Sequence, residues 1–359
     1  MRTAFITRST LYTVPGGDTV QVLQTARFLR KRGISTDILL TSDAIDYTAY
    51  DLFHFTNLTR PADMLYHIRK SKKPFVVSPV LVDYSEYDRV HRDGMAGKLL
   101  RLLPRSANEY MKTVARWITG RDSLKSKSYL WKGQRKSIRE ILAGTAMLLP
   151  NSGAEYRRIR EEYGTVKEYA IVPNGIDPGL FKPGDPSARN EKLVLCAARI
   201  EGIKNQLNLI KALNNTRYTL VLAGSPAPNQ REYYHHCRRV AAGNIVFQDH
   251  LPQEKLAGLY RQAAVHALPS WFETCGLSTL EAAATGCRVV VTDKGYTRDY
   301  FGEDAVYCDP GDPASIFEAI DKAARSDMQN TLQQRVISQY TWAQAAAITA
   351  GAYQKAISS

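Results

Sequence analysis

The chain has 359 residues, of which 44% are apolar, 23% charged and 9% aromatic, and its formal net charge is +13. One hydrophobic core usually stops growing before this length, so we expect two domains, and the composition excludes disordered and collagen-like chains. The opening MRTAFITRST has only short apolar runs, and no run of ~18 uncharged apolar residues follows. The sequence therefore predicts neither a secretory signal nor a membrane span.

The first half of the chain alternates strand and helix patterns. A β-prone run from Thr3 to Thr7 leads to a turn at Pro15-Gly16-Gly17 and then to a helical pattern that Gly33 closes. Further apolar or β-branched runs follow at residues 36–40, 52–55, 75–82 and 146–149, with a helical stretch at 63–71. Strands that alternate with helices predict a parallel sheet covered on both faces, and we assign it to residues 1–172.

The second half repeats this alternation after a segment dense in Pro, Gly, Asn and Asp. That segment, VPNGIDPGLFKPGDPSARNEK, is typical of an interdomain linker. The strands expected after it are 193–197, 218–223, 245–247, 265–268, 288–292 and 305–307, and the helices are 206–213, 253–262, 277–284 and 315–324. The predicted fold class is thus α/β, with two tandem Rossmann-like doubly wound domains, 1–172 and 173–340. Their carboxyl sheet ends are expected to face each other across a cleft.

Positive charge is concentrated in one segment of the first domain. Between Arg89 and Glu140, 14 Lys and Arg residues stand against four acidic residues. Apolar residues recur there at helical spacing, which predicts a basic helical insertion at 89–140. Two interpretations stay open: a surface for an anionic membrane, a phosphate-rich acceptor or a nucleic acid, or a solvated basic face over a packed apolar stripe.

The five cysteines are odd in number and widely spaced. They fit neither a disulfide framework nor a zinc site, so we expect reduced thiols in a cytoplasm and no metal. The positions are Cys196, Cys237, Cys275, Cys287 and Cys308.

The segment PSWFETCGLSTLEAAATGCRVVVT, residues 269–292, carries the most chemical information. Gly276 opens a helix whose first N–H groups can receive a phosphate. Glu281 falls four residues beyond Leu277, where its carboxylate can accept two hydrogen bonds from the vicinal hydroxyls of a ribose. Glu273 lies in the preceding loop, at the other end of such a ligand. This spacing suits a nucleotide sugar, with the diphosphate between its two sugars.

Two cations follow a strand end upstream, in RIEGIKN. Arg199 and Lys204 are placed to neutralise a diphosphate without a metal, and to stabilise the charge that develops on it as a leaving group.

With these residues in place, the chain resembles the family 4 glycosyltransferases of the GT-B fold over nearly its whole length. The landmarks are the Gly16-Gly17 loop, VPNGID at 172–177, Arg199 and Lys204 in RIEGIKN, the Ala223-Gly224 pair of LVLAGSP, Glu273 and Glu281 in a PS…E…GL…LEA…G context, and YTW at 340–342 before a last helix.

The resemblance implies a retaining, metal-independent transferase that uses a nucleotide-diphosphate sugar and needs no cofactor. It places Arg199 and Lys204 on the diphosphate, Glu273 on the donor sugar and Glu281 on the ribose. Gly16, Gly17, Gly224, Gly276 and Leu277 are expected to line the donor site, and the helix at 341–359 to return to the first domain.

Three positions depart from the family pattern. Thr274-Cys275 replaces the usual Gly-Phe beside the donor sugar, Asp249 replaces a glycine near the nucleobase, and PFVVSPVLVDYSEYD lacks the usual first-domain histidine. Asp83 and Glu86 are candidates to supply a polar group in place of that histidine.

The acceptor is expected to be a glycan, a lipid-linked glycan or another anionic molecule, in cell-surface polysaccharide biosynthesis. The expected location is the cytoplasm, with contact at the inner face of an anionic membrane as an open alternative. Two other functions stay open: an inactive scaffold that binds sugar nucleotides, and a nucleic-acid-binding protein. The second lacks any RNP, KH, zinc-finger or helix-turn-helix signature.

Overall fold

The computed structural model describes residues 1–84, 86–87, 110–111, 113–114, 117, 125–164, 168–326 and 330–358. Contacts divide these residues into two compact units. The first unit takes the described residues of 1–85, 93–174 and 342–359, and the second takes those of 86–92 and 175–341. The divisions after residues 174 and 341 lie within two residues of the expected boundaries.

The first unit is built on a five-stranded parallel sheet with strand order β2-β1-β3-β4-β5. Its strands are β1 (Arg2–Thr7), β2 (Ser35–Leu40), β3 (Leu52–Thr56), β4 (Phe75–Ser78) and β5 (Met147–Leu148). Its helices are α1 (Gly17–Lys31), α2 (Pro61–Ser71), α5 (Tyr129–Gly144), α6 (Gly153–Tyr163) and α14 (Trp342–Ser358). The strand order reverses between β1 and β3, where ligands commonly bind in such sheets.

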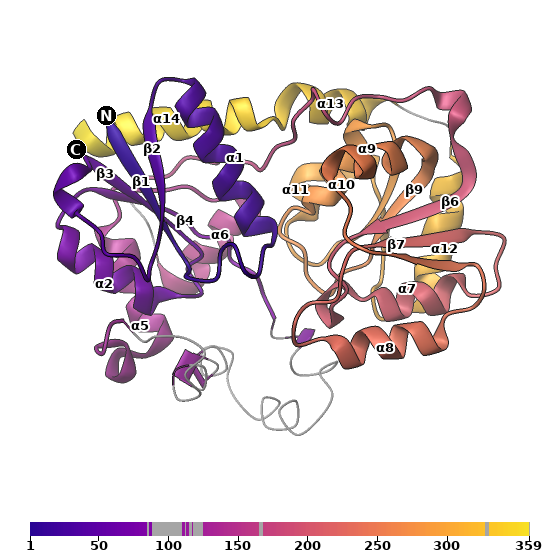
Figure 1. The fold of residues 1–359 in the computed structure, drawn as a ribbon, viewed down its shortest axis with the longest axis horizontal. Helices are drawn as coiled ribbons and strands as arrows, with labels where there is room; N and C mark the ends of the chain where they lie inside the picture. The colour runs from indigo at the N-terminus through magenta and orange to yellow at the C-terminus, as the bar shows by residue number, and fades with distance from the viewer. Residues whose placement is uncertain are drawn as a thin grey trace. The chain divides into compact units, whose positions relative to one another are not determined.

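Side chains of this sheet alternate between two helical layers. Ala4 and Ile6 of β1 belong to a buried cluster that includes residues of α2 and α5. Phe5, between them, faces the other side and stacks on His54, whose Nδ1 lies 2.8 Å from the Tyr353 hydroxyl of α14. Because α14 also packs against α1, the last helix of the chain belongs to the first unit (Figure 1).

The second unit has a six-stranded parallel sheet with order β11-β10-β9-β6-β7-β8. Its strands are β6 (Asn190–Ala197), β7 (Thr219–Ala223), β8 (Ile245–Gln248), β9 (Ala263–Leu268), β10 (Arg288–Thr292) and β11 (Val306–Cys308). Its helices are α7 (Gln206–Leu213), α8 (Arg231–Val240), α9 (Gln253–Gln262), α10 (Leu277–Ala284), α11 (Thr297–Phe301), α12 (Pro313–Arg325) and α13 (Thr331–Gln339). Two buried clusters fill its opposite sheet faces.

The α/β fold class with two parallel sheets is confirmed, and several local expectations need correction. β4 ends at Ser78 and does not reach residue 82, because Pro79 has no N–H to donate and Val80 turns into the left-handed region with φ 45°. The linker is shorter than expected, since β6 already begins at Asn190. Helix α8 was not expected, because charged and polar residues predominate in its sequence and Cys237 is its one fully buried residue.

Most of the basic segment 89–140 lies outside the described residues. Its described end forms the first part of α5, in which two arginines bind the last carbonyls of α6. Arg135 Nη2 donates to Glu162 O at 3.0 Å, and Arg139 Nε donates to Tyr163 O at 3.1 Å. These two cations therefore hold a helix C-terminus, where positive charge is favourable.

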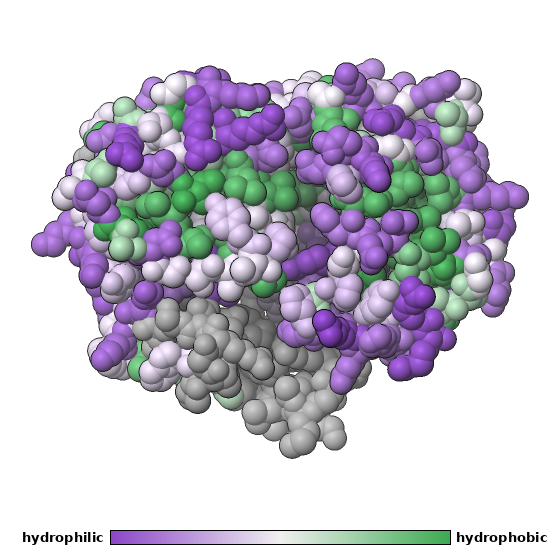
Figure 2. All heavy atoms as spheres, viewed as in Figure 1, coloured by the Kyte–Doolittle hydropathy of each residue, from purple (hydrophilic) through white to green (hydrophobic). Residues whose placement is uncertain are grey.

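The surface of each unit is mixed in character. Figure 2 shows hydrophilic residues in purple over much of the visible face, with green hydrophobic patches between them.

All five cysteines are buried, and each is a free thiol. Within the described ranges, no helix combines the length and the apolar character that a membrane span requires.

Candidate functional site

The loop between β9 and α10 carries Glu273, and a glycine from a neighbouring loop holds it. Glu273 N donates to Lys294 O at 3.1 Å, and Tyr296 N donates to Glu273 O at 2.9 Å. Gly295 lies between these two contacts with φ 109°, and a Cβ there would fall 2.0 Å from Glu273 O. Only glycine fits this position, so the loop after β10 fixes the backbone of Glu273.

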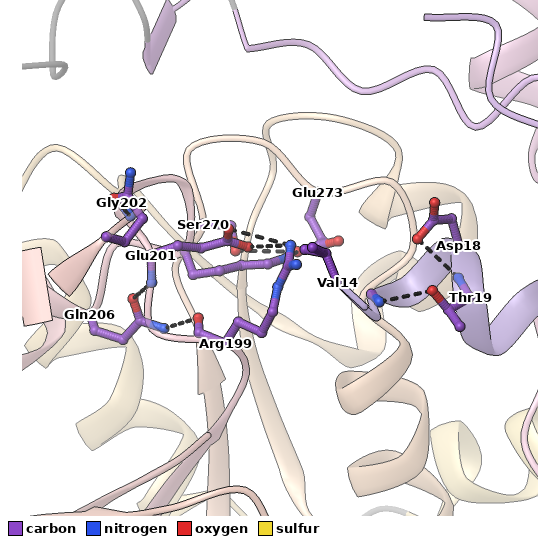
Figure 3. Close-up of polar contacts among 12 residues, drawn as sticks. Val14, Asp18, Thr19, Arg199, Glu201, Gly202, Gln206, Ser270 and Glu273 are labelled. Carbon is purple, nitrogen blue, oxygen red and sulfur yellow. Dashed lines mark hydrogen bonds and ion pairs between the residues drawn. The ribbon is translucent and has the colours of Figure 1, made fainter. Parts of the chain in front are cut away.

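The Glu273 carboxylate is nearly buried and forms an ion pair with Lys204. Its Oε2 lies 2.6 Å from Lys204 Nζ and accepts a hydrogen bond from Ser270 Oγ at 3.2 Å (Figure 3). Partial burial alone would lower the pKa of Lys204, but the carboxylates of Glu273 and Glu201 raise it above its ordinary value. Lys204 is therefore charged.

Arg199 lies beside this pair but bonds to a different carboxylate. Its Nη2 is 3.0 Å from Glu201 Oε1, and 40% of its side chain is exposed. Gln206 clamps the intervening loop, since its Nε2 donates to Arg199 O at 2.9 Å and its Oε1 accepts from Glu201 N at 3.4 Å (Figure 3). The two expected cations thus come from one loop after β6, with different partners.

Gly224 supports the same loop through its backbone. A Cβ on Gly224 would fall 2.0 Å from Ala198 O, and its φ is 153°. Ile200 N donates to Ser225 O at 3.0 Å, so the loops after β6 and β7 lie side by side next to Arg199. The structure accounts for Gly224 by this close approach, and its place in the donor site stays a prediction.

Helix α10 begins where the sequence predicted, directly after Gly276. Gly276 has φ 70°, and a Cβ on it would lie 2.9 Å from Thr279 Oγ1. No described side chain caps this helix, and Leu277 packs against the buried core of the unit. The helix thus begins with uncapped N–H groups, a suitable place for a phosphate.

Glu281 lies one turn along α10 and is partly exposed. The Tyr260 hydroxyl donates to its Oε2 at 3.2 Å. Desolvation raises the pKa of Glu281 to about 8, and the hydrogen bond from Tyr260 offsets only part of this effect. The free protein therefore holds this carboxyl mostly protonated at neutral pH.

The glycine loop of the first unit is organised by a residue that the sequence analysis missed. Arg8, directly after β1, contacts both Asp18 oxygens at 2.7 and 3.0 Å, and its Nη2 donates to Val14 O at 2.9 Å. Gly16 caps α1 in an extended conformation with φ −151°, which any residue adopts, and its N–H donates to Thr19 Oγ1 at 3.0 Å (Figure 3). A conformational need for glycine therefore does not explain Gly16, and the donor-site roles of Gly16 and Gly17 stay predictions.

The candidates for the missing histidine both have other partners. Asp83 Oδ2 lies 2.6 Å from Arg158 Nη2, and Glu86 pairs with Lys294.

Cys275 is buried in the core, which fits a packing role. Among the described residues, no group of three or more His, Cys, Asp or Glu side chains is arranged to hold a metal ion.

The model of the group 1 glycosyl transferases matches residues 191–326, a range that contains every expected site residue of the second unit. Among curated relatives, a D-inositol 3-phosphate glycosyltransferase from Acidothermus cellulolyticus is 27% identical over 50% of this chain and 46% of its own. The enzyme of that name from Pseudarthrobacter chlorophenolicus is 31% identical over 62% and 60%. An MMP alpha-(1->4)-mannosyltransferase from Mycolicibacterium hassiacum is 25% identical over 63% and 58%.

The chain spans about half the length of the first curated relatives that it matches. The matched part is 46% of the Acidothermus cellulolyticus protein, and 54% and 56% of two further enzymes of the same name. Solved structures match over the full length of the chain. Sucrose-phosphate synthase from Thermosynechococcus elongatus aligns with a TM-score of 0.77 and 16% identity over all of both chains. HepE from Anabaena, in complex with UDP-glucose, aligns with a TM-score of 0.71 and 15% identity over 99% of each.

The two parallel α/β units and these structural similarities define the fold as that of the GT-B glycosyltransferases. The family model over residues 191–326 and the named relatives show that the chain is similar to the group 1 glycosyl transferases.

Proposed function

We propose that this protein transfers a glycosyl group from a nucleotide-diphosphate sugar to an acceptor. One observation carries the proposal: the Lys204–Glu273 pair, with an Nζ–Oε2 distance of 2.6 Å, on the loops around an uncapped helix start. A cation and helix N–H groups suit a diphosphate, and a buried carboxylate suits the hydroxyls of a sugar. The family relationship supports the same chemistry.

In this reaction, the bond between the anomeric carbon and the β-phosphate oxygen breaks, and the acceptor oxygen bonds to that carbon on the same face. The acceptor hydroxyl gives its proton to the leaving diphosphate. Arg199 and Lys204 stabilise the charge that develops on the leaving diphosphate. Glu273 orients the donor sugar and Glu281 binds the ribose. We propose retention of configuration and independence of metal ions, with the two cations in the position that a metal occupies in other transferases.

A UDP-sugar is the first donor to test, because HepE binds UDP-glucose. The acceptor is proposed to be anionic, a phosphorylated sugar or a lipid-linked glycan. The net charge of +13 supports this class, as do relatives named for D-inositol 3-phosphate. A cytoplasmic location, with contact at the inner face of an anionic membrane, belongs to the same proposal.

The test is a screen of nucleotide sugars by thermal stabilisation, followed by UDP release from UDP-glucose with D-inositol 3-phosphate as the first acceptor. A matching donor at 100 times its Kd stabilises the protein by about 2.7 kcal/mol. Stabilisation with no UDP release, to acceptor or to water, would favour the inactive scaffold instead. Turnover that EDTA abolishes and Mg²⁺ restores would contradict the metal-independent mechanism.

A further inference from the structure

Glu155, at the start of α6 in the first unit, is a fully buried carboxyl that the proposed chemistry does not use. Its Oε1 accepts the N–H of Leu81 at 2.6 Å, and its Oε2 accepts the N–H of Asn151 at 2.6 Å. Leu81 follows β4 and Asn151 follows β5, so this one carboxyl joins two loops at the carboxyl edge of the sheet. Its hydrogen-bond partners are backbone N–H groups rather than a cation, which is unusual for a buried acid.

The turn that Glu155 holds is strained. Val80, a β-branched residue, has φ 45°, and Asn57 in the neighbouring loop after β3 has φ 72°. The two loops are joined where Asn57 N donates to Ser78 O at 2.9 Å and Leu58 N donates to Pro79 O at 2.8 Å. Left-handed β-branched residues are costly, and they persist where surrounding contacts over-determine them, often beside a ligand.

Further hydrogen bonds extend this frame to the helix of the glycine loop. The Gln21 side chain of α1 donates to Asn151 Oδ1 at 2.9 Å, and both residues are buried. On the other side, Arg158 of α6 pairs with Asp83 at 2.6 Å, three residues past the strained Val80. One chain of contacts therefore connects α1 with the loops after β3, β4 and β5, and Glu155 lies at its centre.

We infer that Glu155 is a positioning residue for the acceptor: it fixes the Val80–Leu81 turn against α1, at the sheet edge where a ligand of the first unit binds. This inference rests on the proposed function, because it assigns this edge to the acceptor. Glu155 touches no reacting atom in this role. Each oxygen of the carboxylate accepts one N–H, whereas an amide in its place has one acceptor oxygen left.

Burial raises the pKa of Glu155 to about 7, although both N–H groups and the charge of Arg158 oppose the shift. Arg158 is the charged group that acts on Glu155, and this arginine in turn pairs with Asp83 and Glu162. At pH 8 the carboxyl is therefore mostly ionised, and each of its oxygens can accept one N–H.

The test compares Glu155→Gln with Glu161→Gln, which changes an exposed glutamate of the same helix. Amide exchange at Leu81 should be about tenfold faster in Glu155→Gln, the effect of one lost charged hydrogen bond, and unchanged in the control. At pH 8, with saturating UDP-glucose and D-inositol 3-phosphate as acceptor, kcat for UDP release should fall in Glu155→Gln and stay at the wild-type value in Glu161→Gln. The Kd for UDP should not change in either variant.

Wild-type kcat in Glu155→Gln, with normal Leu81 exchange, would overturn the positioning role. If wild-type protein releases no UDP, the proposed glycosyl transfer fails instead, and Leu81 exchange alone then decides whether Glu155 holds the turn. Should Glu155→Gln not fold, Glu155→Asp takes its place, because it keeps the charge on a shorter side chain. Leu81 exchange as slow as in the wild type in that variant would overturn the inference.

Discussion

Lys204 and Glu273 are 69 residues apart in the chain, and their Nζ and Oε2 atoms lie 2.6 Å apart in the second unit. The pair is largely shielded from water, with 23% of the lysine side chain and 9% of the glutamate side chain exposed. The Glu273 carboxylate therefore favours the charged form of Lys204. In the proposed function, Lys204 binds the diphosphate and Glu273 the donor sugar.

Removal of the Lys204 charge should weaken nucleotide binding. Lys204→Met removes a cation from the proposed diphosphate site, and we expect the Kd for UDP to rise about ten- to hundredfold, the effect of one charged hydrogen bond. Isothermal titration calorimetry measures this directly. Lys211→Met, at an exposed lysine of α7, is the matched control and should bind UDP like the wild type. Equal affinities in the two variants would remove Lys204 from the site.

UDP affinity should depend on pH through Glu281. A ribose that donates two hydrogen bonds selects the carboxylate, whereas the free protein favours the protonated form below the raised pKa of about 8. Affinity is therefore expected to increase with pH, with about tenfold tighter binding at pH 9 than at pH 7, because about a tenth of the group is ionised at pH 7. Glu281→Gln should bind UDP more weakly and with a flat profile from pH 7 to 9. Pronounced pH dependence in that variant would assign the titration to another group.

Gly295→Ala should disturb the site without replacing a charged residue. The added Cβ would fall 2.0 Å from Glu273 O at a backbone φ of 109°. Because neither atom can yield without moving the loop, we expect a loss of about 2–3 kcal/mol in unfolding free energy and weaker UDP-glucose binding. Urea unfolding and calorimetry test the two effects. Gly243→Ala is the control, because its added Cβ meets nothing within 4 Å. Wild-type stability in Gly295→Ala would show that the loop has room to move.

Arg189 should be a major source of stability in the second unit, although no carboxylate pairs with it in the described chain. It is 8% exposed, and its guanidinium donates to Ala263 O at 2.6 Å and to Tyr260 O at 3.3 Å. Arg189→Met takes the charged donor away from these buried carbonyls and leaves them the weak Cys287 thiol as a donor, which should cost about 1–3 kcal/mol in unfolding free energy. Arg217→Met removes an arginine that is 49% exposed, and should cost less than about 1 kcal/mol. Equal losses would mean that water replaces the buried guanidinium.

Tyr353→Phe tests how firmly α14 is attached to the first unit. The change removes the hydroxyl that lies 2.8 Å from His54 Nδ1 and leaves that buried nitrogen without its partner on α14. We expect a loss of about 1–2 kcal/mol in unfolding free energy, seen as a lower urea midpoint. UDP affinity should not change, because the proposed donor groups Lys204, Glu273 and Glu281 lie in the second unit. Unchanged stability would show that the apolar packing of α14 suffices.

Much of the fold was readable from the sequence because its signals are local. The expected helices 206–213, 253–262 and 277–284 coincide with α7, α9 and α10, since apolar periodicity and glycine stops act within one turn. α8 escaped prediction because it buries so few residues, and the end of β4 did because the left-handed turn at Val80 depends on contacts from other loops.

The candidate site divides in the same way. The sequence by itself determined the residue types and their spacing: two cations after β6, and two glutamates around the start of α10. Only the tertiary structure decided that Lys204 pairs with Glu273, that Gly295 fixes the Glu273 backbone, and that Glu155 joins two loops of the first unit. The physical reason is distance along the chain. Burial, charge pairing and backbone approach depend on residues tens of positions apart, and no short sequence pattern records which of them meet.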